Sequence, residues 1–513
     1  MSSRHQLGVI EYLNNRRVPA PGQKIKRQTH RNQDDQTGQK LVKERVPPVH
    51  NRSIVPVGRH LLPPLIKGKA NINHLPDELM LKLFEYLGAA TLLTAACVCN
   101  RWHGLATENS IWINIYKKYA KVKGNQAVKD SKLPLSYWKN LCLKRCSEDR
   151  NKSILKLMKK IHPFTGLPTN TKLAMTKSGI YYHLKIIDRN GQESSCKSAG
   201  IFWHSMSVCV RWYNLQTVPL KNIRKIQILS CNPLFFDNGG TAINNSPYQR
   251  SLLTECSFKW EVWKRENKAI KEDENVQLYR LSDDILIATW KADEELAFIV
   301  TGFHQENLVK RCLLGSSQTM YELPEHRVIP DDIDSSYGLH HYTCTVEIRN
   351  MRQSIWSQQF QSIECKKENI KDNVCKFVLM RRDRVIDRVT VAKEIELPWK
   401  TDLFKGVVKD VCWLDITLLD ERSEVFWTTS CPVYAKTKET IRSIAMDFEY
   451  DNESKLEIVH QEKNVDVLME LNEMDDGKRF ITHLEINVDT QMIDSWFGTS
   501  YAPPIPKDKL KKK

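Results

Sequence analysis

The sequence contains no run of uncharged apolar residues long enough to span a membrane. Its longest stretch without Asp, Glu, Lys or Arg, residues 86–100, is 15 residues long, whereas a transmembrane helix needs about 20 predominantly apolar residues. The first residues, MSSRHQLGVIEYL, also lack the basic-then-apolar order of a secretory signal peptide. We therefore expect a protein of the cytoplasm, the nucleus or both, without membrane contact.

The motifs of common enzyme classes are missing as well. The chain has no G-x-x-x-x-G-K-[ST], G-x-S-x-G, H-E-x-x-H or G-x-G-x-x-G pattern. His340 and His341 are adjacent, and neighbours on a strand face opposite sides, so one metal ion could not readily bind both. Cys431 has no basic neighbour in the sequence to activate its thiol. We expect no catalytic residue, no metal site and no cofactor.

Cysteine pairs and internal repeats give no further site. The 14 cysteines include no C-x-x-C pair, and most lie in apolar runs, as Cys209, Cys344 and Cys412 do. Reduced, buried thiols are therefore expected rather than a disulfide framework or a zinc site. No period of 20–50 residues is visible, and Gly239-Gly240 stands alone instead of recurring. This excludes propeller and leucine-rich repeat architectures.

The net charge of +16 is unevenly distributed along the chain. Residues 1–70 hold 14 Lys and Arg against 4 Asp and Glu, and residues 507–513 hold 5 Lys against 1 Asp. Residues 71–506 are left with a net charge of only +2. The first 70 residues also contain seven prolines and no sustained period, which predicts a disordered basic tail. We expect no charged groove on the folded body.

One stretch, residues 74–119, has the pattern of short amphipathic helices. After Leu75-Pro76, apolar residues recur at one helix face: Leu79, Met80, Leu83, Phe84 and Leu87. Gly88 is expected to stop this helix, a second apolar run at 92–99 leads to Trp102, and a third segment ends at Trp112. Three short helices in about 45 residues bury too little apolar area to be stable alone, so a partner is expected.

This stretch resembles the F-box. The matching residues, in register over 38 residues, are Leu75-Pro76, Glu78-Leu79, Phe84, Tyr86-Leu87, Leu92-Leu93, Val98-Cys99, Arg101-Trp102, Leu105-Ala106 and Trp112. Thr91 departs from the Asp that many members carry, although Thr can also cap the second helix.

The resemblance implies a bridging function without catalysis. F-box proteins bind Skp1, which connects them to a cullin scaffold carrying a RING subunit and a ubiquitin-charged enzyme. The rest of the chain would then hold a protein substrate, and the reaction rate would come from proximity. The resemblance assigns the building or bracing of the Skp1 surface to Leu75, Pro76, Leu79, Phe84, Leu87, Leu92, Val98, Trp102 and Trp112.

Beyond about residue 176 the pattern changes to strands. Residues 180–187 run into Asn190-Gly191, a hairpin-type turn, and period-2 alternation recurs at 207–213, 258–263, 343–348, 410–418 and 484–488. Alternation predicts antiparallel sheets with one wet and one packed face. The predicted fold class is thus α+β: a three-helix F-box, a helical linker and a large sandwich-like or barrel-like β body.

The predicted organisation is a disordered basic tail at 1–70, an F-box at 71–120, a helical linker at 121–168, a β-rich substrate-recognition body at 169–502 and a basic tail at 503–513. Three other functions stay open at this point. The chain could be a Skp1-bound scaffold without ubiquitylation, a nucleic-acid-binding protein that uses its tails, or a β body that binds a small molecule in a deep apolar pocket.

Overall fold

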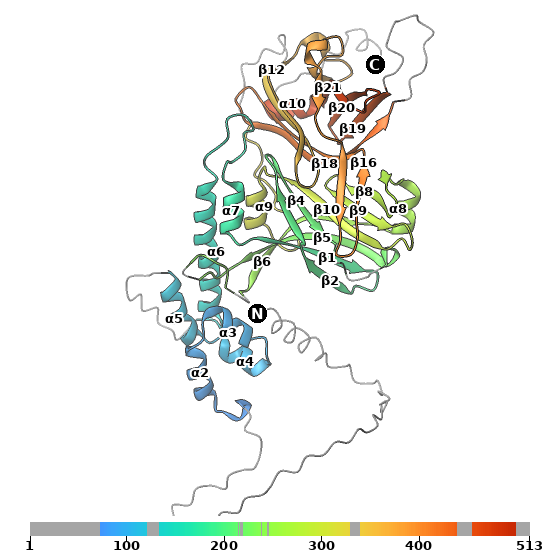
Figure 1. Ribbon diagram of the computed structural model, residues 1–513. Coiled ribbons are helices and arrows are strands. Elements are labelled where there is room, and N and C mark those ends of the chain that lie inside the picture. The colour runs from blue at the N-terminus through green and yellow to red at the C-terminus, as the bar shows by residue number, and fades with distance from the viewer. Residues whose placement is uncertain are drawn as a thin grey trace, which may run out of the picture. The chain divides into compact units, whose positions relative to one another are not determined.

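The structure is a computed structural model that describes residues 72–120, 133–213, 215, 219–237, 239–243, 246–328, 339–438 and 454–498. A helical region comes first, and a β-rich body follows a long helix, α6 (Figure 1). The predicted fold class, with its antiparallel, barrel-like body, is confirmed. The predicted tails at 1–70 and 503–513 lie outside the described residues.

The helical region has four α-helices after a 3-10 turn at Ile72–His74, and we call it the F-box-like region. The helices are α2 (Asp77–Glu85), α3 (Ala89–Ala95), α4 (Asn100–Ala106) and α5 (Asn109–Ala120). The predicted third segment is thus two helices. They are separated because Thr107 Oγ1 donates to the His103 carbonyl at 2.8 Å and closes α4.

Two details of helix capping differ from the prediction. Helix α2 ends at Glu85, and Gly88 does not stop it; Gly88 instead holds the N-cap position of α3 with extended backbone (φ −72°, ψ 162°). Thr91 was predicted to cap that helix, and this is wrong because Thr91 is its third residue. Asp77 and Glu78 do lie in the first turn of α2, where carboxylates offset the helix dipole.

The long helix α6 (Tyr137–Leu157) connects the F-box-like region to the body. Near its start, Trp138 and Cys142 are buried in the core of the F-box-like region. Near its end, Ile154 is buried in the first core of the β body. Helix α7 (Thr171–Lys177) follows and also packs into that core.

The first half of the body is a sandwich of two antiparallel sheets. One sheet has the order β2-β1-β5-β6, formed by β1 (Tyr181–Asp188), β2 (Glu193–Lys197), β5 (Ile223–Pro233) and β6 (Tyr248–Ser257). The other has the order β3-β4-β10-β9-β8-β7, formed by β3 (Gly200–Trp203), β4 (Ser207–Trp212), β7 (Lys271–Glu272), β8 (Val276–Ser282), β9 (Ile285–Trp290) and β10 (Leu296–His304). Their facing apolar residues and helix α9 (Leu308–Leu314) form one core.

The second half is a nearly closed antiparallel barrel. Its strands follow the order β12-β11-β17-β18-β19-β20-β21-β13, and β14 pairs with β21. They are β11 (Leu339–Arg349), β12 (Ser354–Cys365), β13 (Val374–Met380), β14 (Val389–Val391), β17 (Val411–Leu419), β18 (Val425–Thr437), β19 (Ser454–Gln461), β20 (Val465–Glu473) and β21 (Arg479–Asp489). The end strands β12 and β13 lie close together. A hairpin of β15 (Glu396–Lys400) and β16 (Lys405–Lys409) and helix α10 (Thr490–Phe497) complete this half.

The two halves pack against each other through a third β core. Buried Cys209, Phe298 and Val300 of the six-stranded sheet meet Val411 and Trp413 of β17. At Gly302 on β10 an added Cβ would lie 2.2 Å from Trp413 Nε1. A glycine is therefore required there, because the two sheets approach too closely for any side chain.

Two strand predictions need correction. Residues 258–263 were expected to alternate along a strand, but Trp260–Glu266 is the helix α8, in which Trp260 and Trp263 stack 5.5 Å apart at i, i+3 and contact Tyr279. Strand β17 was expected to have a wet face, yet all nine of its residues are buried. Its polar residues face the other half of the body instead of solvent.

Candidate protein-binding site

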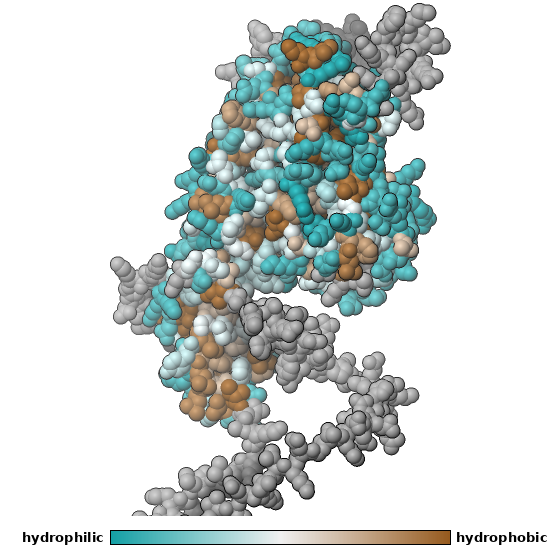
Figure 2. Space-filling view, in the orientation of Figure 1, coloured by the Kyte–Doolittle hydropathy of each residue, from teal (hydrophilic) through white to brown (hydrophobic). Residues whose placement is uncertain are grey.

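Exposed apolar side chains lie on helix α2 of the F-box-like region, at its two ends and in the turn after α3. Leu79 is 52% exposed, Leu83 47%, Tyr86 89% and Val98 62%, and Pro76 beside them is also exposed. Figure 2 shows apolar surface gathered over this region, whereas the sheets are mostly covered by polar side chains. We call Pro76, Leu79, Leu83, Tyr86 and Val98 the apolar patch. A patch of this kind on helices indicates a surface for a protein partner.

The nine residues predicted for this surface divide into three groups. Pro76, Leu79 and Val98 are exposed, Leu75, Leu87 and Trp102 are half-buried, and Phe84, Leu92 and Trp112 are buried at 3% exposure or less. The structure therefore places only the first group fully on the surface. The buried group forms the core that holds the helices together.

Two exposed residues of the patch, Leu83 and Tyr86, are absent from the predicted set. Both belong to the α2 segment, one helical turn or less from Phe84. Leu83 and Phe84 both belong to the apolar pattern of α2. The pattern alone does not show that Leu83 faces solvent while Phe84 faces the core. Tyr86 lies in the matched Tyr-Leu pair, and its position just after α2 explains its exposure.

The Arg101-Trp102 pair fastens the start of α2 to α4. The Arg101 guanidinium donates to Asp77 Oδ1, at 2.9 Å from Nε and 2.6 Å from Nη2, and also to the carbonyls of Asn73 and Leu75. Trp102 Nε1 donates to Asn73 Oδ1 at 3.2 Å, and its ring lies edge-on to Phe84 at 5.4 Å. These contacts fix the Leu75-Pro76 segment, so the patch is held in one arrangement.

The body contributes directly to the core of the F-box-like region. Phe235, which follows β5, is 1% exposed in that core, and its ring lies 5.3 Å from Tyr119 of α5. Helix α6 is tied to the body by Arg150 Nη1, which donates to the Pro233 carbonyl at 2.7 Å, and by Asn151 Nδ2, which donates to the Leu313 carbonyl at 3.3 Å. The patch is therefore connected to the β sheets by packed contacts and not only by a linker.

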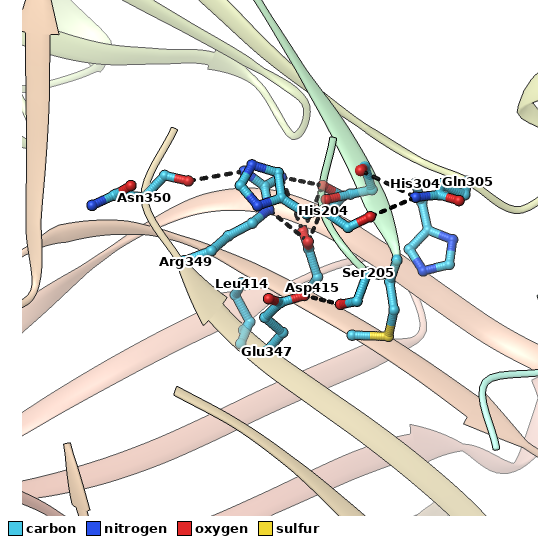
Figure 3. A network of polar contacts seen from close by, with 12 residues as sticks. His204, Ser205, His304, Gln305, Glu347, Arg349, Asn350, Leu414 and Asp415 are labelled. Atoms are coloured by element: carbon cyan, nitrogen blue, oxygen red, sulfur yellow. Dashed lines mark hydrogen bonds and ion pairs between the residues drawn. The ribbon is translucent and has the colours of Figure 1, made fainter. Parts of the chain in front are cut away.

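A buried polar network joins the two halves of the body (Figure 3). Arg349 of β11 donates to Asp415 of β17 at 2.6 Å from Nε and 3.2 Å from Nη2, and both side chains are fully buried. Asp415 also accepts from Ser430 Oγ at 2.7 Å and from Ser207 Oγ of the other half. The carboxylate is thus fully satisfied, and burial, which raises its pKa, is outweighed by Arg349, so that pKa is lowered.

Two histidines of this network are held neutral. His304 Nε2 lies 3.1 Å from Thr417 Oγ1, and His204 Nε2 lies 3.3 Å from the Met351 carbonyl. Burial lowers the pKa of each to about 4, and the positive charge of Arg349 acts in the same direction. Each of these side chains has a hydrogen-bond partner within the chain, as expected of a polar contact that stabilises the packing of two sheets.

The described residues contain no group of three or more His, Cys, Asp or Glu side chains that could hold a metal ion. Among the helices of the described residues, none combines the length and the apolar character of a membrane span.

A hollow of about 780 Å³ lies beside the contact between the two halves. Its walls carry many charged groups, among them Asp283, Asp284, Glu306, Lys310 and Arg311. Burial raises the pKa of Asp284 and of Glu306. This charged hollow therefore differs from the deep apolar pocket that a small-molecule-binding body would need.

The prediction that the body has no charged groove is wrong. A second hollow, about 560 Å³, is lined by Lys185, Arg224, Lys225 and Arg250 with one carboxylate, Glu255. The near-neutral net charge of residues 71–506 hid this local excess, because acidic residues elsewhere on the body cancel it in the sum. Net charge measures a total and not a distribution.

Comparisons with known proteins agree with the helical pattern. A family model described as F-box-like matches residues 72–118. Over most of the chain the sequence is similar to F-box only protein 15: 28% identical to the Bos taurus protein over 84% of this chain and 94% of the relative, 28% to the Homo sapiens protein over 84% and 86%, and 22% to the Mus musculus protein over 83% and 100%.

A solved structure of a DUF3598-family protein from Nostoc punctiforme aligns with 63% of this chain and 99% of its own, at 8% identity and a TM-score of 0.12, which is too low to support any conclusion. The sequence relatives and the matched family model are the basis of the assignment. The chain therefore contains an F-box-like region, residues 72–118, and is similar to F-box only protein 15 over most of its length.

Proposed function

We propose that this chain is the substrate-recognition subunit of an SCF-type (Skp1–cullin–F-box) E3 ubiquitin ligase. Its F-box binds Skp1, and through Skp1 a cullin and a RING subunit, in the cytoplasm or the nucleus. The β body holds a protein substrate. The chain itself performs no chemistry in this proposal, because ubiquitin transfer is accelerated by bringing the substrate close to the charged enzyme.

The observation that carries the proposal is the apolar patch on a braced helical frame. Leu79, Leu83 and Tyr86 are exposed while Phe84 and Trp112 form the core beneath them. Exposed apolar side chains gain roughly 25 cal/mol per Å² when a partner covers them. A rigid frame reduces the ordering cost of binding.

The packed connection between the patch and the body supports the same proposal. A ligase subunit must hold its substrate at a defined place relative to Skp1, and Phe235 and Arg150 tie the F-box to the sheets. We retain the division into an F-box at 71–120, a linker at 121–168 and a substrate-binding body at 169–502 as part of the proposal.

The test is co-expression of the full chain with Skp1 followed by affinity purification. Leu79→Glu/Leu83→Glu should reduce the recovered Skp1 at least tenfold, because two carboxylates would be buried without partners. Leu403→Glu is the matched control: Leu403 is 86% exposed in the turn between β15 and β16 and should leave recovery unchanged. Replacing Leu75-Pro76 by Ala-Ala should also abolish co-purification. Full recovery with both patch variants would contradict the proposal.

A second experiment separates a ligase subunit from a scaffold. Proximity labelling in cells with the proteasome blocked would compare the natural chain with the Leu79→Glu/Leu83→Glu variant. Labelled proteins that carry ubiquitin with the natural chain only are the expected result. Equal ubiquitylation of the labelled proteins with both chains would contradict the ligase function and leave a Skp1-bound scaffold.

A further inference from the structure

The outer face of the four-stranded sheet β2-β1-β5-β6 carries an unusual set of side chains. Along β1, Tyr182, Leu184 and Ile186 point into the sandwich core. The alternate residues Tyr181, His183 and Lys185 therefore lie on the opposite, outer face. The neighbouring strands add Lys197, Lys225, Gln227, Tyr248 and Arg250, which pair with or flank these positions in the sheet register.

The cations of this face are only partly neutralised. Lys185 pairs with Glu193 at 2.7 Å, and Lys225 pairs with Glu255 at 3.1 Å. Within the described part of the chain, Lys197, Arg224 and Arg250 form no ion pair. Three positive charges are thus left without a carboxylate on one side of one sheet, which attracts a negatively charged ligand.

The aromatic rings of the face are already covered by cations. Lys197 Nζ lies 4.7 Å from the centroid of the Tyr181 ring, and the Arg250 guanidinium lies 5.1 Å from that of Tyr248. Arg250 Nη2 also donates to the Tyr248 hydroxyl at 2.9 Å. Nucleic-acid-binding sheets use open ring faces on which bases stack. Here Lys197 and Arg250 occupy a face of each ring, so the arrangement favours binding of carboxylates over stacking of bases.

The positive electrostatic potential of this face also affects His183. Burial lowers the pKa of this imidazole, and the charges of Arg250 and Lys197 lower it further. The ring lies between Tyr181 and Tyr248, at 5.3 Å and 6.3 Å. The imidazole therefore experiences the positive charges of this face without a compensating acid.

The positive charges border a hollow of suitable size. It measures about 560 Å³ and is lined by Lys185, Arg224, Lys225 and Arg250, with Gln227 and Glu255 between them. Ligand sites usually fall between about 300 and 1,000 Å³. Apolar Ile187 and Leu229 form part of the wall. The hollow therefore combines positively charged groups with apolar ones.

We propose that this face is the substrate-binding site of the body and that it takes an extended acidic segment, a run of Asp and Glu, of a protein partner. The identification of that partner as a substrate rests on the proposed function. The charge excess selects carboxylates, and the covered rings disfavour nucleic acid.

The spread of the cations selects an extended segment over a single anion. Arg250 pairs in register with Cys231, seven residues along β5 from Arg224, which forms no ion pair among the described residues. A strand segment of this length spans roughly 20 Å. One phosphate group cannot meet cations at both ends of such a row, whereas about six residues of extended peptide can. The occupant is therefore a stretch of several acidic residues.

The test uses the full chain purified with Skp1 and a synthetic peptide of six glutamates between Gly-Ser flanks. The peptide carries fluorescein for anisotropy and a benzophenone for crosslinking. Lys197→Glu/Arg250→Glu should weaken binding at least tenfold. Crosslinks mapped by mass spectrometry should fall within residues 181–197 and 223–257 of the natural chain.

The matched control is Lys436→Glu/Arg388→Glu. Lys436 also lies over a tyrosine, at 5.0 Å from Tyr434, and Arg388 is exposed. Both double variants change the net charge equally, so any binding to the basic tails falls equally. Equal weakening by the two variants, crosslinks confined to residues 1–70, or tighter binding of a ten-residue uridine RNA would overturn the inference.

Two further readouts complete the test. A single-phosphoserine peptide without other acids should bind more weakly than the glutamate peptide; tighter binding would overturn the assigned occupant. Skp1 recovery is measured on the same preparations. Loss of peptide binding with retained Skp1 supports a site on the body, whereas a natural chain that crosslinks the peptide but recovers no Skp1 contradicts the proposed function alone.

Discussion

The F-box-like region and the contact between the two β halves use side chains in opposite ways. The first exposes apolar residues such as Leu83 and Tyr86. The second buries polar and charged ones, with Arg349 and Asp415 fully enclosed. Both regions depart from the usual rule that apolar residues are buried and polar residues are exposed. The buried polar groups find their partners within the chain, whereas the exposed apolar groups do not.

At the β contact, the partner of each polar group is already there. Ser207 of one half and Ser430 of the other both donate to Asp415, so the contact is complete without another molecule. On the F-box helices the apolar patch has no such cover among the described residues. The comparison teaches that exposed apolar side chains, and not buried charges, mark the surface that awaits another protein.

The largest expected effect is at the buried ion pair. Asp415→Ala should destabilise the chain by about 3–5 kcal/mol, because Arg349 would keep a buried charge without a partner. Thermal and chemical denaturation measure this. The exposed Asp383, paired with Arg381 at 3.0 Å, is the control, and Asp383→Ala should leave the stability nearly unchanged because water screens this pair. An Asp415→Ala chain as stable as the natural one would break the comparison.

The next effect concerns the close approach of the two halves. Gly302→Ala should destabilise by about 1–3 kcal/mol, because the new methyl group would overlap Trp413. Gly104→Ala in α4 is the opposite case: nothing lies within 4 Å of its added Cβ, and it should stabilise the helix by about 0.5–1 kcal/mol. Melting temperatures should therefore shift in opposite directions, and a shift in the same direction would contradict the tight contact.

A smaller effect is expected from acid. His204 and His304 have pKa values lowered to about 4 by burial, against an ordinary value near 6.5. A lowered histidine pKa stabilises the fold above pH 6.5, and this stability is lost as pH falls from about 6.5 through 4, because the unfolded chain binds the proton first.

Thermal melts between pH 7.5 and 4.5 test this acid sensitivity. His304→Asn should flatten the loss of stability with falling pH relative to the natural chain. His103, exposed on α4, is the control, and His103→Asn should leave the slope unchanged. Identical slopes for all three proteins would show that the buried histidines do not carry the pH dependence.

The smallest expected effect on stability is at the apolar patch. Leu83→Glu should change the free energy of unfolding by no more than about 0.5 kcal/mol, because the side chain is already partly in water. The next residue gives the contrast, since Phe84 is buried and Phe84→Ala should cost about 3–5 kcal/mol. A large loss of stability with Leu83→Glu would mean that Leu83 belongs to the core and not to the binding surface.

Much of the fold follows from local sequence patterns. The apolar period of α2, the Asn190-Gly191 hairpin between β1 and β2, and the alternation along β1 and β11 all appear where they were predicted. Helix α8 was missed because Trp260, Val262 and Trp263 have high strand propensity, and the packing of both indoles on Tyr279 decides the structure there. In this segment, contacts between residues distant in the sequence override the local strand propensity.

The burial of β17 could not be predicted for a similar reason. Asp415 and Thr417 alternate with Leu414 and Ile416, and that pattern is the same whether the polar face meets water or another polar sheet. Only the pairing of distant residues, such as Ser207 with Asp415, distinguishes the two cases. The predicted Skp1 set was limited likewise, since spacing identifies a helix stripe but not which of Leu83 and Phe84 faces outward.

The burial of Phe235 among the F-box helices has a consequence for the synthesis of the chain. A ribosome that has completed α5 must add about 115 further residues before it reaches Phe235. At roughly 5–20 residues per second, this takes on the order of ten seconds. During that interval the helices exist without the ring that closes their core. The core of the F-box-like helices is thus completed only when a much later segment of the chain has been synthesised.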